Sequence, residues 1–243
     1  MKLRASIDDV CCLHPEDRDA MFGLMEQNYA NMRRSRFDAD LGTKPLVILV
    51  RSSEGRLVGF STQKVLEAEV DGELVHALYS GDTVIDRRYW GDSALAHTWG
   101  NFALELIERQ LPGRLVWFLT SKGFRTYRYL PLFFHEFFPR PSVETPAWES
   151  AVIDALGSSV GRKRYDPSRK IIRAYDDGDF VRPAIASPGG RPDTDPYVRF
   201  FVDHNPGFAQ GDELCCLAPL TRKNFTRAAY RVINTRSMPL STS

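Results

Sequence analysis

The chain has 243 residues, a length that fits one large domain or two small ones. Hydrophobic residues make up 43% and charged residues 26%, the balance of an ordinary globular protein. The formal net charge is +1, so no overall positive field indicates a nucleic-acid partner, and an anionic ligand has to be held locally. No apolar run reaches the roughly 20 residues that a membrane-spanning helix needs, so no membrane partner is expected.

Two features bear on compartment and metal binding. The first 17 residues carry acidic side chains before any long apolar stretch, which is unlike a secretory signal and favours the cytoplasm. The four cysteines form two adjacent pairs, Cys11–Cys12 and Cys215–Cys216. Adjacent cysteines lack the spacing of common zinc ligands and make strained disulfides. We therefore expect small buried residues and no metal site.

The first half of the chain predicts a helix followed by three antiparallel strands. Met21, Leu24 and Met25 recur at helical spacing within a predicted helix over 15–36. The strands follow at 45–50, 56–70 and 73–85, and Asp71-Gly72 is a strong hairpin turn between the last two.

Between about residues 92 and 111 the apolar side chains recur at helical spacing, which predicts a helix. Pro112-Gly113 ends this helix. The continuous apolar run at 114–120 predicts a buried strand. Strand, helix and strand in this order imply a right-handed crossover and a parallel pair. The predicted sheet is therefore mixed and mostly antiparallel, flanked by helices, in an α/β fold.

The second half predicts helices at 121–138 and from Thr145, where Thr145 is the N-cap and Pro146 the first helical residue. Strands are expected at 170–175, 197–202 and 212–217, and a basic helix at 221–233. Three segments result. They are a domain over 1–182, a Pro- and Gly-rich loop or linker over 183–196, and strands and a helix over 197–243 that complete the same domain.

The stretch Ser80–Leu95, "SGDTVIDRRYWGDSAL", is a strand that turns into a helix. Free N–H groups at a helix start favour an anion, and Gly91 lets a ligand approach the backbone. An arginine, Arg87 or Arg88, adds a charge-assisted contact to phosphate. Asp92 opposes this reading, since as an N-cap it satisfies the same N–H groups.

The segment "RYWGDSA", Arg88–Ala94, resembles the acyl-CoA motif of the GCN5-related N-acetyltransferases (GNAT), Arg/Gln-x-x-Gly-x-Gly/Ala. Arg88 and Gly91 match the motif, Ser93 replaces its second small residue, and Ala94 comes one place late. The order of predicted elements from about Asp17 to Phe138 is also similar to that family.

The resemblance implies an acyltransferase that moves an acyl group, an acetyl group in the first instance, from acyl-CoA to the amine of a small molecule. The pantetheine arm would pair with the strand before the motif, and the pyrophosphate would lie on the motif. The implied cofactor-binding residues are Thr83, Val84, Ile85, Arg88, Gly91, Asp92, Ser93 and Ala94.

Because a thioester is already activated, the chemistry needs a base for the amine and, in some schemes, an acid for the thiolate. Asp82 and His97 are candidate bases, and Tyr127 and Tyr129 are candidate acids; Asp82 and Tyr127 are preferred. An equally good reading of Asp82 is a bulge beside Gly81, and the tyrosines also fit an aromatic core.

Two other functions remain open. The first is N-acylation with a longer chain from acyl carrier protein, as in N-acyl-amino-acid and acyl-homoserine-lactone synthases that share the fold. The second is a non-catalytic domain that binds acyl-CoA or a protein partner. A homodimer is also left open.

Overall fold

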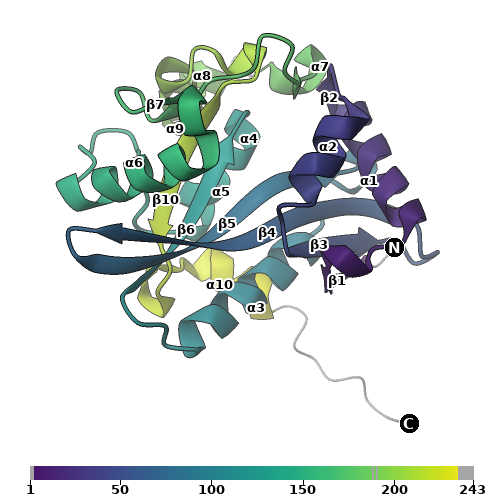
Figure 1. The fold of residues 1–243 in the computed structure, drawn as a ribbon, viewed down its shortest axis with the longest axis horizontal. Helices are drawn as coiled ribbons and strands as arrows, with labels where there is room; N and C mark the ends of the chain where they lie inside the picture. Colours follow the sequence, from purple (N-terminus) through teal and green to yellow (C-terminus); the bar gives the residue numbers. More distant parts are fainter. Residues whose placement is uncertain (1–2, 188, 190, 235–243) are drawn as a thin grey trace.

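The computed structural model describes residues 3–187, 189 and 191–234. Within these residues an eight-stranded sheet has the order β1-β3-β4-β5-β6-β10-β8-β7 (Figure 1). Its strands are β1 Arg4–Asp9, β3 Leu46–Arg51, β4 Leu57–Val70, β5 Glu73–Ile85, β6 Arg114–Ser121, β7 Tyr165–Asp166, β8 Ile171–Ile172 and β10 Glu213–Pro219. Every neighbouring pair is antiparallel except β5 and β6, which run parallel. The predicted mixed, mostly antiparallel sheet is confirmed.

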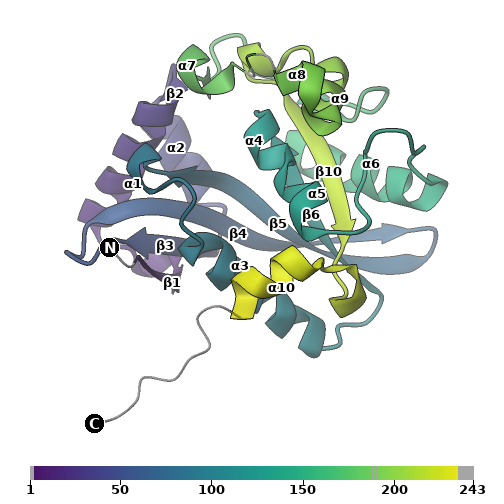
Figure 2. The same cartoon turned by 180° about the vertical axis from the view of Figure 1, so that it is seen from behind.

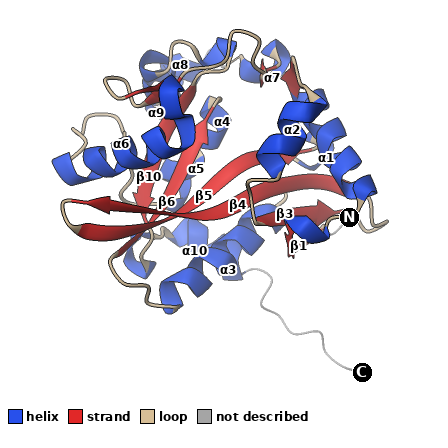
Figure 3. Ribbon diagram, viewed as in Figure 1, coloured by secondary structure: helices blue, strands red, loops and turns tan. Residues whose placement is uncertain are grey.

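Helices cover both faces of this sheet (Figures 2 and 3). They are α1 Pro15–Asn28, α2 Arg34–Leu41, α3 Ala94–Glu108, α4 Phe124–Tyr127, α5 Tyr129–Phe133, α6 Ala147–Gly161, α7 Pro183–Ala186, α8 Arg191–Thr194, α9 Pro196–His204 and α10 Arg227–Asn234. On β4, Phe60 packs with α1 and α2, and Leu66 packs with α6. Side chains an even number apart point to one face of a strand, so α1, α2 and α6 share a face, called here the α1 face. Ile48 packs with α3 on the opposite face, called the α3 face.

Four local predictions were wrong. Cys215 and Cys216 are buried as predicted, but Cys11 and Cys12 are exposed. The helix predicted over 15–36 is divided into α1 and α2 by the short strand β2 Tyr29–Ala30, which pairs with β9 Phe180–Val181. Helix α6 begins at Ala147 with Pro146 as N-cap and no side-chain cap, so Thr145 does not cap it.

The strand predicted over 197–202 is part of helix α9. The Asp195 carboxylate accepts hydrogen bonds from the backbone N–H groups of Tyr197 and Val198, and Pro196 occupies the first turn. This cap outweighs the β-propensity of the Val and Phe residues.

The segment 183–196, predicted as a loop, contains the short helices α7 and α8. Residues 188 and 190 of this segment are not among the described residues. In the predicted final segment, 197–243, β10 enters the sheet between β6 and β8, and α10 packs on α3. Residues 235–243 of that segment lie outside the described residues.

Candidate functional site

The site is built where β5 and β6 separate. Their parallel pairing ends at Ser80↔Leu119. Beyond this point β6 pairs only with β10, and β5 continues on β4 as far as Ile85↔Gly59. The stretch of β5 from Gly81 to Ile85 therefore has no strand along its β6 side within the described residues.

Hydrogen-bond direction shows which backbone groups line this open edge. The Asp86 N–H donates to the Val58 carbonyl at 2.8 Å. Backbone groups alternate in direction along a strand, so the N–H and carbonyl of Val84 also point toward β4. The N–H and carbonyl groups of Thr83 and Ile85 point to the open side. The Trp90 indole confirms this direction, since its Nε1–H donates to the Ile85 carbonyl at 3.0 Å.

A β-bulge interrupts β5 beside the separation. Thr83 pairs with Ser61 and Ser80 with Gln63, so β5 has one extra residue at Gly81–Asp82. Glycine is required here, because a Cβ at Gly81 would lie 2.6 Å from Thr62 Oγ1 and 3.1 Å from Lys44 Cε. The extra residue places Asp82 and Val84 on the α1 face, the face of Tyr79.

A buried hydrogen-bond network supports the bulge from the α3 face. Ser80 Oγ donates to Gln63 Oε1 at 2.8 Å, and Gln63 Nε2 donates to Ser61 Oγ at 2.7 Å. The indole N–H groups of Trp99 and Trp117 donate to Ser80 Oγ at 3.1 and 3.0 Å. Because every polar atom of the Ser80 side chain is satisfied, the strand is held rigidly next to the separation.

Asp82 is the titratable residue at the separation. Burial raises the pKa of its carboxyl to about 6, and the Asp40 carboxylate adds to the rise, while Lys122 and Lys44 act in the opposite direction. A carboxylate with such a pKa is a stronger base than an ordinary one and is ionised at neutral pH.

Lys122 lies across the gap, directly after β6. Its ammonium contacts the Asp179 carboxylate and lies 3.6 Å from Glu213 Oε1. Burial lowers the pKa of Lys122, but Glu213 and Asp179 outweigh burial, and the net pKa is raised. The ammonium stays protonated and sits 5.6 Å from the centre of the Tyr29 ring.

On the β5 side, the buried Lys44 ammonium donates to both oxygens of Asp40 at 2.7 and 2.8 Å. It lies 5.7 Å from the centre of the Tyr79 ring. Together these ionic groups form one assembly, called here the charged cluster, whose members are Asp40, Lys44, Asp82, Lys122, Asp179 and Glu213.

The residues of the predicted pyrophosphate corner lie together but are largely bonded to one another. Helix α3 begins at Ala94 with Ser93 as its N-cap, so Asp92 is not the N-cap residue that the sequence suggested. The Asp92 carboxylate nevertheless accepts the Ala94 N–H at 2.7 Å. The Arg88 guanidinium pairs with Asp86 at 2.6 Å. Gly91 has φ +96°, a conformation that favours glycine.

Backbone N–H groups at this corner are mostly taken. Five of these N–H groups donate to acceptors within the corner; they belong to Arg88, Tyr89, Trp90, Asp92 and Ala94. Among the described residues, the N–H groups of Gly91 and Ser93 have no such acceptor. An anion here would meet the N–H groups of Gly91 and Ser93, those of Leu95 and Ala96 in the first turn of α3, and the side chains of Arg87 and Arg88.

Tyr127 is not brought near Asp82. Its side chain is fully buried in the core cluster of the α3 face, beside Phe137 and Phe201. Its hydroxyl donates to the Pro139 carbonyl at 2.9 Å, and burial raises its pKa. The role of Tyr127 as an acid stays a prediction, and the geometry gives it no open approach to the separation.

The alternative catalytic candidates, His97 and Tyr129, have other partners. His97 Nδ1 is 3.2 Å from the Val232 carbonyl on α10, and Tyr129 stacks on Phe133.

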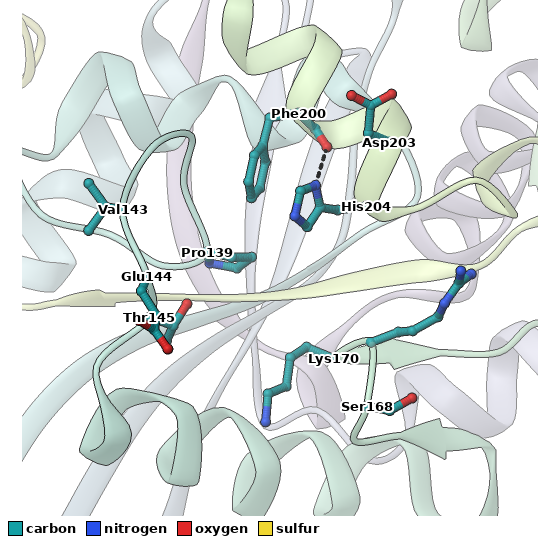
Figure 4. Close-up of a pocket in the computed structure, with 10 residues that line it drawn as sticks. Pro139, Val143, Glu144, Thr145, Ser168, Lys170, Phe200, Asp203 and His204 are labelled. Atoms are coloured by element: carbon teal, nitrogen blue, oxygen red, sulfur yellow. Dashed lines mark hydrogen bonds between the residues drawn. The ribbon is translucent and has the colours of Figure 1, made fainter.

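A separate cavity of about 420 Å³ lies between the 139–145 loop, the 168–170 loop and α9 (Figure 4). None of its lining residues belongs to the charged cluster.

Among the described residues, no group of three or more His, Cys, Asp or Glu side chains is arranged to hold a metal ion. No described helix combines the length and apolarity needed to cross a bilayer.

No protein-family model and no curated protein matches the sequence. Among solved structures, the chain is similar to several N-acetyltransferases. A probable N-acyltransferase from Enterococcus faecalis is 15% identical, with a TM-score of 0.41, over 56% of this chain and 33% of the other. The chain thus spans about a third of that protein's length. A GNAT family N-acetyltransferase from Escherichia coli, in complex with CoA, is 16% identical, with a TM-score of 0.38, over 53% of this chain and 69% of the other. A GCN5-related N-acetyltransferase from Kribbella flavida is 11% identical, with a TM-score of 0.41, over 56% and 34%.

Sequence reasoning found Asp82 but missed its partners. Lys44 and Asp40 stand at an i, i+4 spacing after the predicted helix, and Lys122 follows a predicted strand, so each carried a weak signal. Asp179 and Glu213 come from segments far along the chain, and only the fold shows that they meet Lys122.

Proposed function

We propose that the chain is an acyl-CoA-dependent N-acyltransferase that transfers an acyl group, an acetyl group in the first instance, to the amine of a small molecule. The observation that carries this proposal is the position of Asp82. A carboxyl with a pKa of about 6 lies beside an unpaired backbone edge, where two parallel strands separate.

The donor would enter along that edge. Thr83, Val84 and Ile85 form the segment on which the pantetheine arm would lie. Within it, the N–H groups of Thr83 and Ile85 and the Thr83 carbonyl face the opening, whereas Trp90 already occupies the Ile85 carbonyl. These groups can pair with the amides of an extended arm as a further strand would.

The pyrophosphate would then reach the corner at Arg88, Gly91, Asp92, Ser93 and Ala94. The backbone N–H groups of Gly91 and Ser93, with those of Leu95 and Ala96 at the start of α3, are available donors, and the arginine side chains supply charge. The Asp92 carboxylate, already bonded to the Ala94 N–H, reduces the strength of this site.

The reaction requires one base. The neutral amine attacks the thioester carbonyl carbon, the C–N bond forms, and the C–S bond breaks to release the CoA thiolate. Asp82 accepts the proton that the amine nitrogen loses. A thiol binds a proton far more tightly than a carboxyl of pKa about 6, so this proton can pass to the thiolate. The products are the amide and CoA thiol, and no second acid is needed.

A non-catalytic role as an acyl-CoA or partner-binding domain is favoured by one observation. The corner between Arg88 and Ala94 satisfies most of its own N–H groups, which a phosphate-binding loop leaves open. In that case acyl-CoA binds without turnover, or does not bind.

Thermal unfolding with acetyl-CoA, decanoyl-CoA or no ligand separates these functions. A ligand at about 100 times its Kd stabilises the folded state by about 2.7 kcal/mol. Stabilisation by acetyl-CoA, with CoA thiol released when amines are added, supports the proposal. Stabilisation by decanoyl-CoA alone would instead favour the longer-chain alternative and a carrier-protein donor, and no stabilisation by either would reject the proposal.

A further inference from the structure

A second cavity, of about 390 Å³, lies at the edge of the sheet rather than at the β5–β6 separation. It is formed by the first residues of β1 and the turn that joins β3 to β4, and β1 is the outermost strand of the sheet as described (Figure 1). Its polar lining comes from two arginines and three serines, Arg4, Arg51, Ser6, Ser52 and Ser53. None of these residues belongs to the charged cluster or to the corner at 88–94.

The two arginines of this cavity face each other across a strand pair. Arg4 on β1 lies directly opposite Arg51 on β3 in the antiparallel register. Residues opposite each other share a face of the sheet, and like charges in such a pair repel and destabilise it. Among the described residues that line the cavity there is no carboxylate. The arrangement therefore favours an anion between the two guanidinium groups.

The protein itself neutralises this pair only in part. Arg51 Nη2 donates to Asp17 Oδ1 at 2.7 Å, and Arg51 Nη1 makes a long contact of 3.4 Å to the Gly55 carbonyl. These contacts leave further N–H groups of the Arg51 guanidinium for a ligand. Among the described residues, no side chain or carbonyl forms an ion pair or hydrogen bond with the Arg4 guanidinium. One positive charge is therefore left without a counterion at the cavity.

A buried serine is an independent sign of an absent ligand in the same cavity. Ser52 lines the cavity and is 3% exposed, and its Oγ has no hydrogen-bond partner in the described structure. The backbone of the turn fixes this residue, because the Ser52 N–H donates to the Arg56 carbonyl at 2.9 Å and the Gly55 N–H donates to the Ser52 carbonyl at 3.0 Å. A buried hydroxyl without a partner is costly, so we expect a ligand to supply one.

The chemistry of the lining selects an oxyanion. Guanidinium groups form charge-assisted, bidentate hydrogen bonds with phosphate. The Ser6 hydroxyl already donates to Asp8 Oδ2 at 2.6 Å, so the hydroxyls of Ser52 and Ser53 are the ones left to donate to a ligand. A tetrahedral phosphate presents enough acceptor oxygens to meet both arginines and a hydroxyl at once, which a carboxylate with two oxygens does less well.

We propose that this cavity binds a phosphate group between Arg4 and Arg51, with the Ser52 hydroxyl as a further donor. The phosphate is inorganic or belongs to a monoester of a small molecule, since both present the same oxygens. The site is separate from the corner at 88–94, where Arg88 pairs with Asp86.

The test is a ¹H–¹⁵N NMR titration of the full chain at constant ionic strength, first with inorganic phosphate and then with phenyl phosphate. We expect saturable shifts of the Ser52 and Ser53 amides with a Kd of about 1 mM or tighter, and no such shifts with chloride. Tighter binding of phenyl phosphate supports a monoester as the ligand. Equal or weaker binding supports inorganic phosphate.

Variants locate the effect. Arg4→Gln should weaken phosphate binding at least about tenfold, because it removes a charge-assisted contact. Without phosphate, this variant should unfold at the same temperature as the unaltered protein or higher, since the repulsion between the arginines is gone. Ser52→Ala should also weaken binding. Arg56→Gln is the matched control, because Arg56 is an exposed arginine of the same turn that does not line the cavity, and it should keep the phosphate affinity.

Three outcomes would overturn the proposal. The first is the absence of saturable shifts at Ser52 and Ser53 with both phosphates. The second is an unchanged affinity in Arg4→Gln. The third is a loss of phosphate binding in Arg88→Glu, which would assign the phosphate to the corner at 88–94 instead.

Discussion

Replacing Asp82 by asparagine should make the protein more stable while it abolishes turnover. In the folded chain the carboxyl has a pKa of about 6 against an ordinary 3.8. An acid whose folded pKa is raised favours the folded state at low pH, and this contribution is lost as the pH rises through the folded pKa. Above about pH 6, the charged Asp82 therefore destabilises the fold.

The magnitude follows from that pKa. The difference corresponds to about 3 kcal/mol of lost stability at about pH 8 and to about 0.5 kcal/mol at about pH 4. The asparagine amide is neutral at both values, so the variant should gain between about 1 and 3 kcal/mol at about pH 8 and almost nothing at about pH 4. For a chain of this length, each kcal/mol raises Tm by about 2–4 °C.

The assay is thermal unfolding of both proteins at the two pH values, with Asp176→Asn as a control that should show no such change. The same Asp82→Asn variant should lose about 10²–10⁴ in kcat/KM, as expected for a general base. A variant less stable than the unaltered protein at the higher pH, or a stability gain independent of pH, would refute the electrostatic reasoning. Unchanged turnover would remove Asp82 as the base.

Four further predictions follow from the geometry. In the unaltered protein, kcat/KM referred to the concentration of neutral amine should fall about tenfold per pH unit below about 6 and level off above it; a flat profile on that scale argues against a carboxylate base. Ser80→Ala should cost about 3 kcal/mol in a denaturant titration, because two indoles and Gln63 lose a buried partner. A cost below about 0.5 kcal/mol means that the network does not hold the strand. Gly211→Ala should speed hydrogen exchange at Arg182, whose N–H donates to the Asn28 carbonyl beside the β2–β9 pair, because a Cβ at residue 211 would collide with the Asp179 carbonyl oxygen; unchanged exchange at Arg182 would show that Gly211 does not hold this segment in place. Arg88→Glu should weaken acetyl-CoA binding at least about tenfold, measured by calorimetry, and undiminished affinity places the pyrophosphate elsewhere.

Much of the sheet could be predicted because its information is local. Continuous apolar runs mark β3 and β6, and Asp71-Gly72 marks the hairpin of β4 and β5. The hydrophobic pattern changes from strand to helix spacing at α3 and back to a strand at β6. This strand–helix–strand order predicted that β5 and β6 run parallel, because such connections are right-handed crossovers between parallel strands. Strand β1 escaped prediction because "RASIDD" is polar and gains its place only by pairing with β3.

The site was predicted only in part, for the same physical reason. Asp82 was chosen because it directly precedes the expected cofactor segment, and the competing interpretation, a bulge beside Gly81, is also present in the structure. The carboxylates that accompany it, Asp179 and Glu213, come from the segment 175–186 and from β10. The positions of these segments depend on contacts between residues far apart in the sequence, as in the Arg36–Asp177 pair. Tyr127 was chosen because the family that the sequence resembles often uses a tyrosine after its fifth strand, but in this chain Tyr127 is buried in the core.

The most direct test of the account is an end-point assay by mass spectrometry. The protein is incubated with acetyl-CoA and a panel of primary monoamines and diamines, and the acetylated amine and free CoA thiol are quantified together. The account predicts equal amounts of the two products and a loss of both in Asp82→Asn. If acetyl-CoA stays intact with every amine and does not stabilise the protein against heat, the chain is not an acyl-CoA-dependent acyltransferase.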